Sequence, residues 1–172
     1  MNHLKKTLQL FIIAGVSLAS LNVFAYDDAH NNELEALSPE VRLEEYSLSK
    51  KGLALKGYDP VAYFKEGPTK GSKKLSYTFN GVTYRFSSEE NLEAFEAEPF
   101  AYEPQYGGWC AWAMSEGGGR TEANPERFRI IDDKLYVFYD GLFGDTLDLW
   151  NKVDDDDALI DKADGFWEEQ VL

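Results

Sequence analysis

The sequence predicts an α+β fold, in which two β-hairpins form a small antiparallel sheet packed with short helices in a single compact domain. Two stretches alternate apolar and polar residues around a two-residue turn, and short helical patterns lie between and after them. No strand–helix–strand alternation is long enough for a parallel sheet. With 172 residues, 44% of them hydrophobic, the chain has enough apolar content for one domain with a core.

The first 25 residues are typical of an export signal that is cleaved after Ala25. Lys5 and Lys6 precede an apolar run at residues 8–21. This run is shorter than the roughly 20 apolar residues of a membrane-spanning helix. We therefore expect a periplasmic or secreted protein that begins near Tyr26 and has no membrane contact, with a retained anchor as the alternative.

The expected mature protein is strongly acidic. The full chain has 17 Lys and Arg against 31 Asp and Glu, and loss of residues 1–25 removes two lysines and no acid, which changes the net charge from −14 to −16. Nucleic acid and anionic membranes are bound through Lys and Arg, so this charge repels both. Nucleic acid is therefore not an expected partner.

The polar residues 26–45 are expected to form a leader, and the domain is expected to span residues 46–172. The domain begins with a short strand near residues 53–55. Asp59 and Pro60 then favour a turn, which leads into a helical turn formed by the apolar residues 61–64.

The first hairpin is predicted at residues 75–86, where Asn80 and Gly81 match a two-residue turn whose central residues both need positive φ. This turn sets the register, and alternation of side chains places the paired apolar residues on one face. The expected pairs are Phe79 with Val82, Tyr77 with Tyr84, and Leu75 with Phe86.

A helix follows, because Ser87 and Glu90 fit a capping box and Pro99 ends the apolar pattern. The second hairpin is predicted at residues 128–139, with its turn at Asp132 and Asp133. This register gathers four apolar residues on one face: Phe128, Ile130, Leu135 and Val137. Apolar residues among acids predict two short helices in residues 147–172, and the sequence shows no internal repeat.

Four blocks together resemble the YHS-domain family in its secreted, single-domain form. In chain order they are KGYDPVAYF, FNGVTYRFSS, FEAEPFAYEPQYGGWCAWAM and IIDDKLYVFY. The resemblance covers about residues 46–167 and implies a small α+β module. It also implies an association with metal, since relatives occur attached to copper-transporting ATPases.

The family's metal ligands do not carry over to this chain. Metal-associated relatives have a cysteine just after the Asp-Pro-Val and two more where the second strand meets the helix. The matching positions here are Ala62, Ser87 and Asn91, none of which provides a thiolate.

Cys110 is the only cysteine, and after export the remaining soft or nitrogen ligands are Met114 and His30. A structural zinc site needs four ligands. Cu(I) accepts fewer, and Cys110 and Met114 would share one face of a helix that starts near Gly108. The alternatives are that both residues pack in the core, or that two copies share copper through their Cys110 thiolates.

The sequence does not supply the partner residues that catalysis by Cys110 would need. A helix N-terminus would favour its thiolate, but the one mature imidazole is that of His30 and a second cysteine is absent. The acidic run at residues 154–157 is interpreted as a solvated face.

Aromatic residues with polar tips often line binding clefts. A ligand site is therefore predicted where Tyr58, Asp59, Tyr106 and Cys110 are expected to converge. The sequence thus favours a non-enzymatic binding or accessory module of undetermined ligand. A copper-binding protein that uses Cys110 and Met114 is the first alternative, and a thiol-dependent enzyme or redox sensor is the second.

Overall fold

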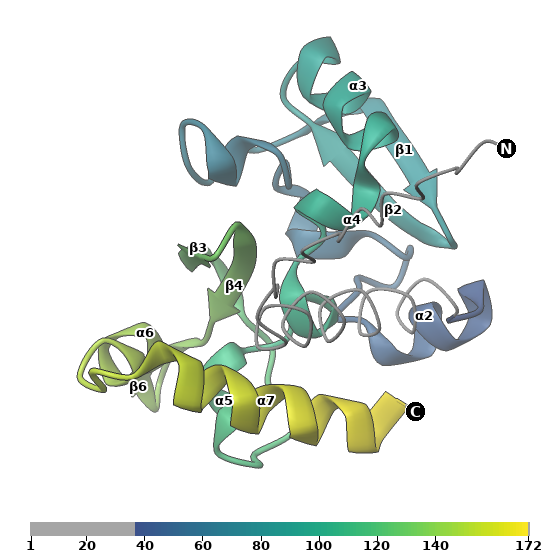
Figure 1. The fold of residues 1–172 in the computed structure, drawn as a ribbon. Coiled ribbons are helices and arrows are strands. Elements are labelled where there is room, and N and C mark those ends of the chain that lie inside the picture. Colours follow the sequence, from purple (N-terminus) through teal and green to yellow (C-terminus); the bar gives the residue numbers. More distant parts are fainter. Residues whose placement is uncertain (1–36, 172) are drawn as a thin grey trace, which may run out of the picture. The chain divides into compact units, whose positions relative to one another are not determined.

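A computed structural model describes residues 37–171, and within them the predicted α+β class is confirmed (Figure 1). Leu37–Leu172 form one compact unit. The predicted signal at residues 1–25 lies outside the described residues. The helices are α2 (Pro39–Glu45), α3 (Glu89–Ala97), α4 (Pro99–Tyr102), α5 (Ala111–Ser115), α6 (Thr146–Trp150) and α7 (Asp156–Val171). The strands are β1 (Ser72–Phe79), β2 (Val82–Phe86), β3 (Asn124–Ile131), β4 (Lys134–Phe138), β5 (Asp140–Gly141) and β6 (Gly144–Asp145), and the short 3₁₀ turns are η1 (Ala54–Gly57), η2 (Ala62–Phe64) and η3 (Gln105–Gly108).

The first hairpin, β1–β2, confirms the predicted turn and most of the register. Asn80 and Gly81 have φ of 43° and 84°, as a two-residue turn of this type requires. Phe79 pairs with Val82 and Tyr77 with Tyr84. The predicted pairing of Phe86 with Leu75 is wrong, because an irregularity between Ser72 and Ser76 moves the partner of Phe86 to Ser72.

Helix α3 begins one residue later than the predicted capping box. Ser88 is the N-cap, and its hydroxyl accepts a hydrogen bond from the backbone N–H of Asn91 at 3.1 Å. Ser87 is not the cap, because its N–H and hydroxyl both donate to Asp59 at 2.7 Å. The helix ends before Pro99, as predicted, and α4 starts at that proline.

The second hairpin, β3–β4, has the predicted register throughout its closed end. Asp132 and Asp133 form the turn with φ of 48° and 58°, and Ile131 pairs with Lys134. The hairpins do not join, since β1–β2, β3–β4 and β5–β6 are separate two-stranded sheets. Both faces of β4 are buried. Each face of β4 therefore packs in a different apolar cluster.

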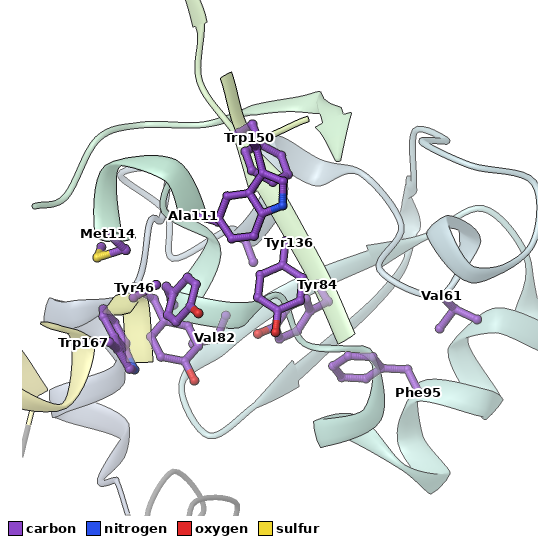
Figure 2. Close-up of a cluster of buried hydrophobic side chains, with 14 of the residues drawn as sticks. Tyr46, Val61, Val82, Tyr84, Phe95, Ala111, Met114, Tyr136, Trp150 and Trp167 are labelled. Atoms are coloured by element: carbon purple, nitrogen blue, oxygen red, sulfur yellow. The ribbon is translucent and has the colours of Figure 1, made fainter. Parts of the chain in front are cut away.

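The larger cluster lies between β2, β4, α5 and α7, and ten of its residues are labelled in Figure 2. The smaller cluster contains Leu135 and Val137, with Phe128 and Ile130 packed against it. This confirms the face that the sequence predicted for the second hairpin.

The C-terminal part contains α6 and α7, but α7 is not short. It has 16 residues, and its buried side chains Leu159, Ala163 and Trp167 recur at spacings of four along one face. The helix packs beside α5 (Figure 1). Within residues 37–171 no helix is long and apolar enough to cross a membrane.

Part of the predicted polar leader is ordered. Pro39–Glu45 form α2, capped by Ser38, and Arg42 of this helix is fully buried. The strand expected at residues 53–55 is wrong except for one parallel bridge between Leu53 and Thr83. Leu55 and Lys56 have φ of 49° and 50° in η1, and this left-handed backbone cannot continue a strand.

The structure contains a repeat that the sequence does not show: residues 53–97 and 104–150 follow the same order of elements. Each has a left-handed 3₁₀ turn, an aromatic residue, a short helical segment, a hairpin with a two-residue turn, and a further helix. The backbone N–H of Tyr58 closes the first turn by donating to the carbonyl of Leu55, and the backbone N–H of Trp109 closes the second by donating to the carbonyl of Tyr106. Tyr58 and Trp109 are thus equivalent.

Asp59 and Cys110 are equivalent in the same way. The backbone N–H of Asp59 donates to Thr69 at 2.8 Å, and that of Cys110 donates to Thr121 at 2.9 Å. Each side chain then accepts from the first backbone N–H after its hairpin, which is Ser87 at 2.7 Å for Asp59. For Cys110 the donor is Tyr139 at 3.2 Å.

Candidate functional site

Cys110 is fully buried at the N-cap of α5. Its sulfur accepts from the Tyr139 N–H and lies 3.3 Å from the Thr146 hydroxyl oxygen. The single hydroxyl proton of Thr146 goes to the Tyr139 carbonyl at 2.9 Å, so the thiol is the donor toward Thr146. The thiol therefore uses both its acceptor and its proton inside the fold.

Met114 is fully buried in the larger cluster (Figure 2). Among residues 37–171, no three or more His, Cys, Asp or Glu side chains are grouped so that they could hold a metal ion. That finding does not test a pair of one cysteine and one methionine. Copper binding by Cys110 and Met114 therefore stays a prediction.

Asp59 is fully buried, and its carboxylate accepts five hydrogen bonds. One oxygen accepts from the backbone N–H groups of Val61 and Ala62, at 2.9 and 3.2 Å. The other accepts from the N–H and hydroxyl of Ser87 and from the Asn91 amide at 2.8 Å. The carboxylate thus ties η2 to the junction of β2 and α3.

The Asp59 network also brings together the three positions where the resemblance expects cysteines. Ala62, Ser87 and Asn91 all donate to this carboxylate. The Lys65 ammonium adds a contact to the Asn91 amide oxygen at 2.8 Å. A hydrogen-bond network therefore occupies these positions in place of sulfur ligands.

The side chains of Tyr58 and Tyr106 have different hydrogen-bond partners and lie in different apolar clusters, so these contacts do not bring the two tyrosines together. The Tyr58 hydroxyl donates to Glu126 at 2.5 Å, and this bond raises the pKa of Tyr58. The Tyr106 hydroxyl donates to Asp164 at 2.8 Å. Tyr58 packs in the smaller cluster and Tyr106 in the larger one.

A buried polar group that the sequence did not predict links α2 to the core. The Arg42 guanidinium pairs with Glu103, and the Tyr84 hydroxyl donates to the same carboxylate. Burial raises the pKa of Glu103, against the opposing effect of Arg42. Arg42 also lies over the ring of Tyr46 at 4.8 Å. These residues anchor the helix.

A second ion pair that was missed uses the acidic run at residues 154–157. Arg129 donates to both oxygens of Asp156, at 2.8 and 2.9 Å, and the Trp150 indole donates to one of them at 2.6 Å. The pair fixes the start of α7 against β3. Asp156 is thus structural, whereas Asp154 and Asp155 are exposed.

An open groove of about 360 Å³ lies where the two left-handed turns approach each other. We call it the Trp109 groove, and its lining residues are Ser47, Leu48, Ser49, Lys56, Trp109 and Glu122. A small extension beside it reaches Leu55 and Gly108. The groove is thus built from both repeats and the segment that follows α2.

The backbone around the Trp109 groove is strained. Leu55, Lys56 and Tyr106 have positive φ although none is glycine, and each such residue costs about 1–3 kcal/mol. Gly107 follows with φ of 57°, and a Cβ at this position would lie 2.7 Å from the Tyr46 ring. Strain of this kind is concentrated at binding and active sites in folded proteins.

The groove has a hydrophobic wall and a charged mouth. The Trp109 indole nitrogen donates to the Glu45 carbonyl at 2.6 Å, which fixes the ring. The Lys56 ammonium lies 2.9 Å from Glu122, and both side chains are about half exposed or more. The Lys70 ammonium donates a hydrogen bond to the backbone carbonyl of Lys56 at 3.2 Å.

Comparison of the chain with protein-family models, with curated proteins and with solved structures finds no match. The resemblance to the YHS-domain family therefore stays a prediction. Fold and site define a small α+β protein in which the Cys110 thiol and the Asp59 carboxylate are hydrogen-bonded inside the fold, and in which the Trp109 groove is open to solvent.

Proposed function

We propose that this protein is a non-enzymatic binding module and that its recognition site is the Trp109 groove. The observation that carries the proposal is the aromatic-walled groove itself, which is lined by the left-handed residue Lys56 and whose small extension is lined by the left-handed residue Leu55. Such a backbone persists only where the surrounding structure holds it, and it is selected where it positions a site.

The state of the other candidate residues supports a binding role over a catalytic one. Asp59 and Cys110 are fully buried and bonded within the fold, so neither is available to a substrate. A general base or nucleophile must reach the reacting atom within hydrogen-bond distance. The groove itself presents hydroxyls, one lysine and one glutamate beside an indole, which is a recognition surface.

The expected ligand combines an apolar group with a negative charge. The apolar group lies on Trp109, and the charge pairs with Lys56 after the exposed Glu122 side chain has swung aside. At about 360 Å³ the groove is at the small end of ligand sites, which span roughly 300–1,000 Å³. It therefore suits a small molecule or a short protruding segment.

Anilinonaphthalene sulfonate, an apolar anion whose fluorescence rises in hydrophobic sites, tests this proposal. We expect saturable binding that is weakened at least about tenfold in Trp109→Ala and in Lys56→Glu, since tenfold corresponds to about 1.4 kcal/mol. Lys162→Glu, an equal charge change at an exposed site on α7, is the matched control and should bind as the wild type does. Equal binding by all four proteins would refute the groove as the site.

A further inference from the structure

The most exposed large hydrophobic residues of the described chain lie side by side at one tip. Leu142 is 98% exposed and Phe143 is 94% exposed, whereas the next, Leu43, is 46% exposed. They connect β5 to β6, and we call residues 140–145 the apolar finger. Exposed apolar groups of this size at one point mark an interaction site.

The finger is an insertion relative to the first repeat. There β2 ends at Phe86 and α3 begins at Glu89, with two residues between them. In the second repeat β4 ends at Phe138 and α6 begins at Thr146, and the finger occupies the extra length. Insertions within a repeat commonly form binding loops.

The finger is already ordered before it meets a partner. The Thr146 N–H and hydroxyl both donate to the Tyr139 carbonyl at 2.9 Å, which closes its base. Arg127 pairs with Asp140 and Asp145 on its two strands. A pre-ordered contact loses little conformational entropy on binding.

Charge indicates what the finger meets. Its stem carries Asp140 and Asp145, which share the single base Arg127, and the exposed Asp148 follows on α6, so the acids are in excess at this end of the molecule. Two fingers packed against each other would bring these acids together, so a symmetric contact between fingers is unfavourable. The complementary surface is basic and has an apolar hollow.

This chain presents such a surface. Residues 50–74 contain seven lysines and two acids, in a protein whose net charge is −14. The Trp109 groove opens beside this segment, with Lys56 at its mouth and Lys50 and Lys51 following Ser49. The acidic finger and the lysine-rich segment beside the groove are therefore complementary in charge.

We propose that the apolar finger of one copy binds the Trp109 groove of a second copy, with Leu142 and Phe143 against Trp109. This inference rests on the proposed function, because it names the occupant of the same groove. The contact is head to tail, so any assembly of copies keeps one free finger at one end and one free groove at the other. The assemblies therefore become longer as the protein concentration rises. The contact is small, so dissociation constants on the order of 0.1–1 mM are expected.

Complementation between two variants tests the proposal, with the protein purified in the form that its host produces. The finger variant carries Leu142→Ser and Phe143→Ser, and the groove variant carries Lys56→Glu. Leu142 and Phe143 are almost fully exposed and Lys56 is about half exposed, so we expect these variants to retain the fold. Sedimentation equilibrium should show a rising average mass for the wild type and monomers for each variant alone.

An equimolar mixture of the two variants should form dimers and nothing larger, because only one intact finger and one intact groove can meet. Leu43→Ser is the matched control for loss of an exposed leucine and should associate as the wild type does. Association should also weaken as salt screens the charges.

Two results would overturn the inference: a wild type that stays monomeric on the order of 1 mM, or variants that fail to complement each other. Binding to phosphatidylcholine vesicles that is lost in the finger variant would reassign the finger to a lipid surface. If one of these results is obtained and the groove nevertheless binds anilinonaphthalene sulfonate as expected, the finger inference fails while the proposed function stands.

Discussion

Removal of the Asp59 carboxylate is expected to be among the most destabilising single changes in this protein. Asp59→Ala leaves the backbone N–H groups of Val61, Ala62 and Ser87 and the Asn91 amide without their acceptor. Each buried donor left unpaired costs about 1–3 kcal/mol. Water that enters the vacated space recovers part of this, so we expect a loss of about 3–5 kcal/mol in the free energy of unfolding.

Two further variants separate the hydrogen bonds from the packing. Asp59→Asn keeps the shape of the side chain, but it replaces one carboxylate oxygen with an NH₂ group that faces hydrogen-bond donors. We therefore expect the free energy of unfolding to fall by about 2–4 kcal/mol. Cys110→Ala at the equivalent position removes the acceptor of one backbone N–H, that of Tyr139, and should cost about 1–3 kcal/mol.

Urea unfolding followed by tryptophan fluorescence measures these differences from the shift in midpoint at constant slope. The expected order of stability is wild type, Cys110→Ala, Asp59→Asn, Asp59→Ala. If Asp59→Ala loses less than about 1 kcal/mol, or if Asp59→Asn is neutral, the carboxylate does not hold the donors as argued.

Two other outcomes follow from the buried groups. The Cys110 thiol should react with an aromatic disulfide reagent only on unfolding. Rapid modification of the native protein would show instead that the thiol is reactive in the fold. Sub-micromolar affinity for Cu(I), measured against a competing chelator and lost in Cys110→Ser, would show that the thiol binds copper. Burial raises the pKa of Tyr84 and Tyr136 above the ordinary value of 10, so their contribution to stability is complete below pH 10 and is lost as the pH rises above it. The free energy of unfolding from urea titrations should fall above pH 10 by up to about 1.4 kcal/mol per pH unit for each such tyrosine. The fall should be less steep in Tyr84→Phe, and a flat profile would contradict the assignment.

The hairpin turns could be predicted because their signals are local. Asn80 with Gly81 and Asp132 with Asp133 accept positive φ, and each turn fixes the register of its neighbours. The error at Phe86 arises at the end of the hairpin far from the turn, where β1 departs from regular pairing between Ser72 and Ser76. Nothing in the alternation of that segment marks the irregularity.

The misplaced helix cap shows how tertiary contacts override local patterns. Ser87 and Ser88 both fit the N-cap position of α3, and the capping-box pattern with Glu90 favours Ser87. The choice is made by Asp59, 28 residues earlier in the chain, which engages the N–H and hydroxyl of Ser87. Arg42 is a similar case, since its burial depends on Glu103 at a separation of 61 residues.

The Trp109 groove had no signal in the sequence for a different reason. Leucine, lysine and tyrosine rarely adopt left-handed backbone, so Leu55, Lys56 and Tyr106 gave no hint of a turn. The only local pointer was the glycine pair before Trp109, and Gly107 does have positive φ. The predicted site near the QYGGWC segment contains Tyr106 and Cys110, whereas the residue of that segment that lines the groove is Trp109.

The repeat separates what builds the fold from what is left for recognition. Positions shared by the two halves, such as Asp59 and Cys110, accept equivalent hydrogen bonds, so the lone thiol takes a place that a carboxylate fills elsewhere in the same chain. The halves differ at Trp109, which lines the groove where the equivalent Tyr58 is buried, and at the finger, which has no counterpart in the first half. Recognition is therefore to be sought at those two features.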